Sequence, residues 1–160
     1  MRATLILSFL ALAACSPQPA TSQGTMPELD GTFEFTQLEI VNDSGERLSF
    51  DVYLAKTDKQ RRRGLMFVRN MPESTGMLFL YDQEDIHSMW MKNTYISLDI
   101  IFALGDGRIS SLTPDTVPLS LASLASKEPV QYVLELNAGA ARRFGIGQRS
   151  RIIWNDDEQE

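Results

Sequence analysis

The stretch HSMWMKNTYISLDIIF, from His87 to Phe102, holds the residue types best suited to metal chemistry in this chain. His87 is the only histidine, and Met89 follows it two positions later. Imidazole nitrogen and thioether sulfur suit Cu(I). Neighbours on one face of a strand stand about 6.6 Å apart, so three of them cannot close on one ion without a bend, which leaves a two-ligand site or one completed by Met77 from elsewhere. One hypothesis is therefore a copper site made of His87, Met89 and Met77, and the alternative is that these methionines fill gaps in a core.

The polar residues of the same stretch indicate a different kind of site. Lys92, Asn93 and Thr94 end one expected strand and open a turn, and binding residues often lie on loops held by a rigid scaffold. Further along, Asp99 and Glu135 each stand among apolar neighbours in expected strands. We expect these five residues to line a small polar pocket for a sugar-like or peptide-like ligand of the cell envelope.

Two other interpretations of the carboxylates stay open. Asp99 and Glu135 could accept hydrogen bonds from turn backbone, or pair with Lys92 or Arg142. They could also act as the acid and base of a hydrolase, because glycosidases need two carboxylates about 5 to 10 Å apart. The chain has no G-x-S-x-G motif, no second histidine and no glycine-rich phosphate loop, so enzyme classes are disfavoured. We expect no cofactor apart from the copper alternative.

The elements that position these residues are mostly short strands. FEFTQLEIV and RLSFDVYLA alternate apolar and polar residues around the turn NDSGE, which predicts a hairpin. Thr57 and Gln60 have capping-box spacing ahead of Gly64, which predicts a short helix over TDKQRRRG. A second short helix is expected over AGAARRFG, with Asn137 as its cap.

Further strands are expected in GMLFLY, HSMWM, LDIIFAL, RISSLTP, VQYVLELN and RSRIIW, with DQED as a turn and 115–129 as a loop. If 87–91 is a strand, His87, Met89 and Met91 share one face, and Ser88 and Trp90 share the other. The fold class is therefore mainly β (α+β), an antiparallel sandwich or partly open barrel with two short helices.

The N-terminus predicts export and lipid attachment. Residues 1–14 contain Arg2 and the apolar run ATLILSFLALAA, which is typical of a signal peptide and too short to span a bilayer. LAAC resembles a lipobox, so Cys15, the only cysteine, is expected to carry the lipid. Residues 15–32 read as a flexible tether, 33–154 as one globular β-rich domain, and 155–160 as an acidic tail. We expect the protein on the periplasmic face of a bacterial membrane, with Ser16 favouring the outer membrane.

The charge excludes one class of partner. The formal net charge is -6, whereas nucleic-acid binding depends on basic patches that neutralise phosphates. The short runs Arg61–Arg63 and Arg142–Arg143 are read as solvated helix faces. The expected partners are thus the membrane, through the lipid, and a small-molecule or envelope ligand.

Several motifs together resemble one family. In order and spacing, GLM, GMLF, WMKNT followed by LDIIF, and VLEL are similar to the domain-of-unknown-function 192 family. The resemblance spans about 52–153. It implies a small, mainly β domain that is often exported in bacteria, and it implies no catalytic residue.

Overall fold

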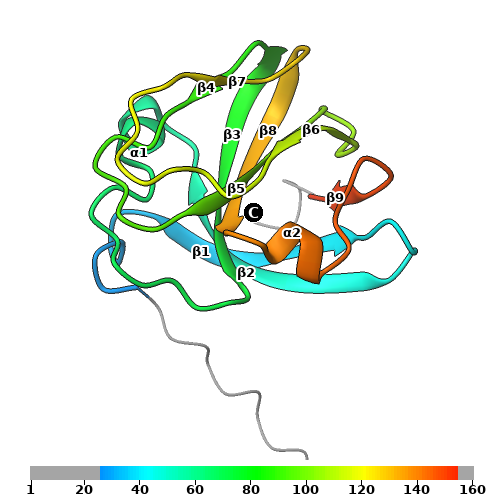
Figure 1. Cartoon of the computed structure of the whole chain (residues 1–160), viewed down its shortest axis with the longest axis horizontal. Helices are drawn as coiled ribbons and strands as arrows, with labels where there is room; N and C mark the ends of the chain where they lie inside the picture. Colours follow the sequence, from blue (N-terminus) through cyan, green and yellow to red (C-terminus); the bar gives the residue numbers. More distant parts are fainter. Residues whose placement is uncertain (1–25, 155–160) are drawn as a thin grey trace, which may run out of the picture.

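The structure, a computed structural model, describes residues 26–154. Nine strands and two short helices occur within this range (Figure 1). The strands are β1 Glu34–Val41, β2 Arg47–Ala55, β3 Thr75–Asp85, β4 Ser88–Met89, β5 Leu98–Ala103, β6 Ile109–Thr113, β7 Leu124–Ala125, β8 Val130–Asn137 and β9 Arg151–Ile153. The helices are α1 Asp58–Arg63 and α2 Ala140–Arg143.

Seven strands form one sheet that curls until its two ends nearly meet. Its order is β6-β5-β8-β3-β2-β1-β9. A single bridge, Arg108 to Arg151, links the two ends, and the Ile152 N–H donates to the Gly107 carbonyl at 2.8 Å. The predicted class is confirmed: the protein is mainly β, with a partly open barrel and two short helices.

The curled sheet separates two apolar clusters. The inner cluster includes Leu38, Phe50, Ile101 and Leu134, and α2 contributes Ala140 to it. The outer cluster lies beneath α1 and the small β4-β7 ribbon. It includes Tyr53, Met77, Phe79, Met89, Met91 and Val133. A residue in this sheet therefore points either into the barrel or toward α1 and β4.

The predicted hairpin and first helix are confirmed. β1 pairs with β2 from Glu34–Leu54 to Val41–Arg47. At α1, the Gln60 N–H donates to Thr57 Oγ1 while Gln60 Oε1 accepts from the Thr57 N–H, so the capping box is complete. Such reciprocal bonds satisfy two donors that a helix N-terminus otherwise leaves open.

Several details differ from the prediction. β2 and β3 run parallel, because the chain crosses through α1 between them, so the sheet is mixed. β3 continues through DQED, which was expected to be a turn, and the expected loop 115–129 contains β7. Asn137 does not cap α2; its side-chain amide donates to the Met71 and Pro72 carbonyls, and Gly139 stands at the cap instead.

The packed part of the chain begins earlier than the expected boundary at residue 33. Met26, Leu29 and Phe33 are buried in the outer cluster, and the Met26 N–H donates to the Tyr53 hydroxyl at 2.6 Å. Residues 26–33 therefore pack against the same apolar cluster as Tyr53.

The predictions for Cys15, for the signal segment 1–14 and for the tail 155–160 concern residues outside the described range. Within 26–154, neither helix has the length and apolarity that crossing a bilayer requires.

Candidate ligand pocket between α1 and β4

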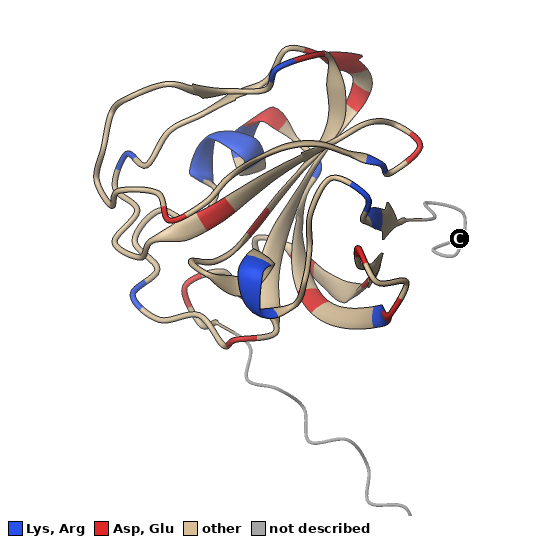
Figure 2. Ribbon diagram, turned by 45° about the vertical axis from the view of Figure 1, so that its right-hand side comes forward, with Lys and Arg blue, Asp and Glu red and all other residues tan. Residues whose placement is uncertain are grey.

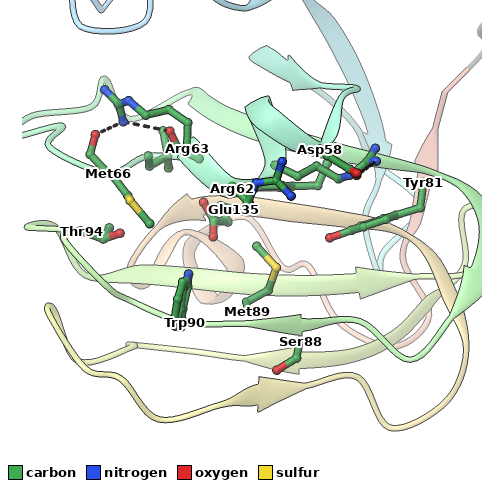
Figure 3. Close-up of a pocket in the computed structure, with 14 residues that line it drawn as sticks. Asp58, Arg62, Arg63, Met66, Tyr81, Ser88, Met89, Trp90, Thr94 and Glu135 are labelled. Atoms are coloured by element: carbon green, nitrogen blue, oxygen red, sulfur yellow. Dashed lines mark hydrogen bonds and ion pairs between the residues drawn. The ribbon is translucent and has the colours of Figure 1, made fainter.

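A pocket of about 270 Å³ opens between α1 and the β4 strand (Figure 3). It exceeds the roughly 150 Å³ of an engineered apolar cavity that holds benzene. Its walls combine the arginines of α1, thioethers, aromatic rings and one carboxyl group. The lining residues are Asp58, Arg61, Arg62, Arg63, Gly64, Leu65, Met66, Phe79, Tyr81, Ser88, Met89, Trp90, Thr94 and Glu135.

Glu135 is the most unusual group in this lining. It stands on β8 opposite Met77 of β3 and Ile100 of β5, so it points to the outer face. The residue is 3 % exposed and makes no hydrogen bond or ion pair with any described residue. Burial raises the pKa of its carboxyl from an ordinary value of 4.5 to about 8. At neutral pH Glu135 is therefore mostly a neutral acid whose O–H can donate into the pocket.

Two of the three arginines of α1 are held by the protein itself. Arg61 donates to the Lys56 and Leu80 carbonyls, at 2.6 and 2.7 Å, and pairs with Asp58. Arg63 donates to the Met66 carbonyl and lies over the Phe67 ring at 5.3 Å. Arg61 therefore ties α1 to the preceding segment and to β3, whereas Arg63 fixes the loop that leaves α1.

Arg62 is different, because it is exposed and makes no hydrogen bond or ion pair with the described residues. Its guanidinium reaches the pocket from α1, on the side that faces Met89 and Trp90 (Figure 3). The prediction of a solvated helix face therefore fits the exposed Arg62 but not Arg61 or Arg63, which are held by other parts of the protein. The sequence signal available for this site was a capped helix ending in three arginines and Gly64.

The β4 side of the pocket follows the predicted alternation. Met89 and Met91 are 8 % and 1 % exposed, whereas Trp90 is 48 % exposed. Only Ser88 and Met89 form a strand, shorter than expected. The amino group of Lys92 lies 5.0 Å from the centre of the Trp90 ring, which orients the indole at the rim.

The structure brings only part of the expected polar site together. Thr94 and Glu135 line the pocket. Lys92 and Asn93 belong to the adjoining turn, where Asn93 adopts a φ of 56° and its carbonyl accepts from the Phe67 N–H at 2.8 Å. These two shape the rim without lining the cavity.

Asp99 lies elsewhere. It pairs with Leu136, points into the barrel and accepts three backbone N–H bonds, from Asp115, Gly139 and Ala141. The expected five-residue pocket therefore needs correction, and so does the carboxylate pair of the hydrolase hypothesis, since Asp99 and Glu135 face opposite sides of the sheet. The interpretation as an acceptor of turn backbone holds for Asp99.

The three residues of the copper hypothesis occupy different settings. Met89 lines the pocket, while Met77 is fully buried in the outer cluster. The His87 ring stacks on the Tyr81 ring with centres 3.4 Å apart, and burial lowers the pKa of His87. Among the described residues no three His, Cys, Asp or Glu side chains gather as a metal site.

Solved structures that share this fold include two similar proteins. A protein from Sinorhizobium meliloti 1021, described provisionally as a transcription regulator, is 40 % identical with a TM-score of 0.74, over 76 % of this chain and 94 % of that one. A protein of unknown function from Novosphingobium aromaticivorans DSM 12444 is 32 % identical with a TM-score of 0.76, over 84 % of this chain and 94 % of that one.

No curated protein matches significantly. The profile of the DUF192 family, described as "Uncharacterized ACR", matches residues 39–154, which include α1, β4 and Glu135. The chain therefore belongs to the DUF192 family.

Proposed function

We propose that this protein is a binding or accessory domain of the bacterial cell envelope that holds a small molecule in the pocket between α1 and β4. The observation that carries the proposal is Glu135, a buried acid that faces a cavity and has no partner among residues 26–154. Burying a polar group without a hydrogen bond costs about 1 to 3 kcal/mol in proteins. A ligand that accepts from the carboxyl of Glu135 would offset this cost.

The rest of the lining suits binding more than turnover. Apolar and aromatic walls with a few convergent polar groups are typical of ligand sites. Thr94, Glu135 and Arg62 are among the polar groups, and Trp90 supplies an exposed ring. The pocket has no nucleophile with an adjacent base among the described residues that line it.

The cellular setting is also a proposal and rests on the sequence. A signal segment followed by LAAC and a polar segment supports export, cleavage before Cys15 and lipid attachment at the periplasmic face of a membrane, the outer membrane being favoured.

The pocket can be tested with residues 15–160 carrying Cys15→Ser, labelled with ¹⁵N. The probes are N-acetylglucosamine, diglycine, benzyl alcohol, benzoate and benzylammonium. We expect at least one probe to shift the amides of Met89, Trp90 and Thr94 saturably. Met66→Trp, which places a larger side chain in the pocket wall, should abolish the shifts, whereas Met66→Leu should preserve them. If no probe shifts these amides at millimolar concentration, the proposal is wrong.

One observation favours a second candidate, the binding of Cu(I). Nε2 of His87 is buried and has no hydrogen-bond partner among the described residues, and a neutral imidazole is the form that ligates metals. Anaerobic titration with Cu(I) against a competing chelator tests this candidate. One-to-one binding that is lost in both His87→Gln and Met89→Leu would support it, and equal binding in the variants would rule it out.

A further inference from the structure

The charged side chains that line the pocket have a net positive charge when Glu135 is neutral. Asp58 and Arg61 form an ion pair at 2.6 Å, so their charges largely cancel. Arg62 and Arg63 remain, and of these only Arg62 has guanidinium donors that bond no residue in the described range. A guanidinium with open donors and a neutral acid that can donate one hydrogen bond are both complementary to an anionic oxygen.

A second hollow shares part of its lining with the pocket. Its volume is about 320 Å³, and it is lined by Ser88, Met89, Trp90, Leu121 and Ser123. The first three residues also line the pocket that contains Glu135, so the two hollows adjoin at Trp90.

The second hollow presents apolar surface that the fold does not cover. Trp90 is 48 % and Leu121 is 70 % exposed. The backbone holds this surface in place, because the Met91 N–H donates to the Ser120 carbonyl at 3.0 Å and the Leu119 N–H donates to the Thr94 carbonyl at 3.1 Å. Apolar surface held next to a polar pocket is suited to a ligand with one polar and one apolar end.

We propose that the ligand is an amphipathic organic acid: its carboxylate lies between Arg62 and the buried carboxyl of Glu135, and its apolar chain passes Trp90 toward Leu121. This inference rests on the proposed function and adds the chemical class of the ligand. No bond is made or broken. The protein donates to the carboxylate from two sides and removes the chain from water.

The first test compares three ligands of equal length at pH 6, where Glu135 is protonated. Hexanoate, 1-hexanol and hexylammonium are titrated into the lipid-free chain 15–160 and followed by the fluorescence of Trp90, with Trp154→Phe removing the second indole. We expect hexanoate to bind tightest. Butyrate should bind more weakly and octanoate more tightly, by about three- to fourfold for each CH2 that is buried.

Matched variants locate the two ends of the ligand. Arg62→Gln should weaken hexanoate about 10-fold, in the range of a lost charge-assisted hydrogen bond, while Lys59→Gln on the same helix should leave it unchanged. Glu135→Gln keeps a donor and should retain binding, whereas Glu135→Leu should lose it. Leu121→Ser should reduce the gain from hexanoate to octanoate.

The outcomes separate this inference from the proposed function. Preference for hexanol or hexylammonium, or equal hexanoate affinity in Arg62→Gln and the parent, would overturn the organic-acid assignment while the pocket remained a binding site. If none of the three ligands nor any of the earlier probes binds, both proposals fail.

Discussion

Asp99 and Glu135 stand on adjacent, paired strands of one sheet, yet they point to opposite faces. Glu135 pairs with Ile100 and Asp99 with Leu136, so the β-strand period of two separates the carboxyls. Asp99 is fully enclosed and accepts three N–H bonds, whereas Glu135 faces a cavity and makes no hydrogen bond within the part of the chain that the structure describes. The same chemical group thus has a structural role on one face and a candidate binding role on the other.

Replacing Asp99 should lower stability without altering the pocket. Its Oδ1 accepts from the N–H groups of Asp115 at 2.9 Å and Gly139 at 3.1 Å, and its Oδ2 from Ala141 at 2.9 Å. Asp99→Ala leaves these donors unmatched, and each buried unmatched donor costs about 1 to 3 kcal/mol. We expect urea unfolding to show a loss of about 3 kcal/mol or more.

The milder Asp99→Asn should lower the free energy of unfolding by less than Asp99→Ala. Its one amide oxygen still accepts, while its amide nitrogen faces a backbone N–H that is then left without an acceptor. Asp82→Asn, at an exposed position of β3, is the control and should be neutral. An Asp99→Ala protein as stable as the parent would show that these backbone donors find other partners.

Glu135 should make the folded state less stable as the pH rises. The folded protein keeps the proton of Glu135 up to a pKa of about 8, while the unfolded chain releases it above the ordinary 4.5. Between these values the unfolded state binds fewer protons, so the free energy of unfolding falls with pH and then levels off above about 8. At about 1.4 kcal/mol per pKa unit, the whole effect is on the order of 5 kcal/mol.

Glu135→Gln removes this titration, so its free energy of unfolding relative to the parent should increase steadily in urea titrations at pH 5, 6, 7 and 8. His87 contributes a pH dependence of the opposite sign, because its lowered pKa makes stability rise up to about pH 6.5. That contribution is common to both proteins and cancels in the difference. A difference that does not vary with pH would mean that Glu135 is ionised and solvated in the folded state.

Alternation within strands made much of this arrangement predictable. The sequence placed Asp99 and Glu135 among apolar neighbours in strands that the structure contains as β5 and β8, and the capping box at Thr57 predicted the start of α1. The relation between the two strands was not predictable, because a shift of one residue in pairing exchanges the faces. For that reason the sequence predicted Asp99 and Glu135 in one pocket, whereas the structure places them on opposite faces of the sheet.

The rest of the pocket depends on a long-range crossing that sequence patterns do not contain. α1 carries the chain from β2 to the parallel β3, and this crossing places the arginines of α1 across from Trp90 and Met89. Figure 2 shows that α1 is mostly basic, although the formal net charge of the whole chain is -6. From the sequence alone, adjacent arginines predict only a solvent-exposed helix face.

Gly64 should be intolerant of a side chain. It ends α1 with φ 44° and ψ -143°, and an added Cβ would lie 3.3 Å from the Phe79 ring. Such a backbone conformation costs a residue other than glycine about 1 to 3 kcal/mol. We expect Gly64→Ala to lose at least that amount in thermal or urea unfolding, and to weaken probe binding because the loop after α1 lines the pocket.

Gly31→Ala is the comparison, since Gly31 also has a positive φ of 72° but nothing lies within 4 Å of its added Cβ. Its loss should be about 1 kcal/mol, the cost of the left-handed backbone alone. Equal losses at the two glycines would show that the contact with Phe79 is accommodated.

Cys15 should determine whether the protein stays with the membrane. If the chain is cleaved before Cys15 and acylated there, each buried CH2 contributes about 0.8 kcal/mol, and more than one acyl chain gives stable anchoring. We expect the wild-type protein, expressed with its own N-terminus in a bacterium that processes lipoproteins, to pellet with membranes and to dissolve only in detergent. Cys15→Ser should appear in the soluble periplasmic fraction or remain uncleaved, and Ser16→Ala should behave as wild type, because the neighbouring serine carries no lipid.

Mass spectrometry of the N-terminal peptide provides the second readout for Cys15. A diacyl or triacyl mass on this residue is expected. An unmodified cysteine in a membrane-bound protein would show that something other than this lipid holds the domain at the membrane.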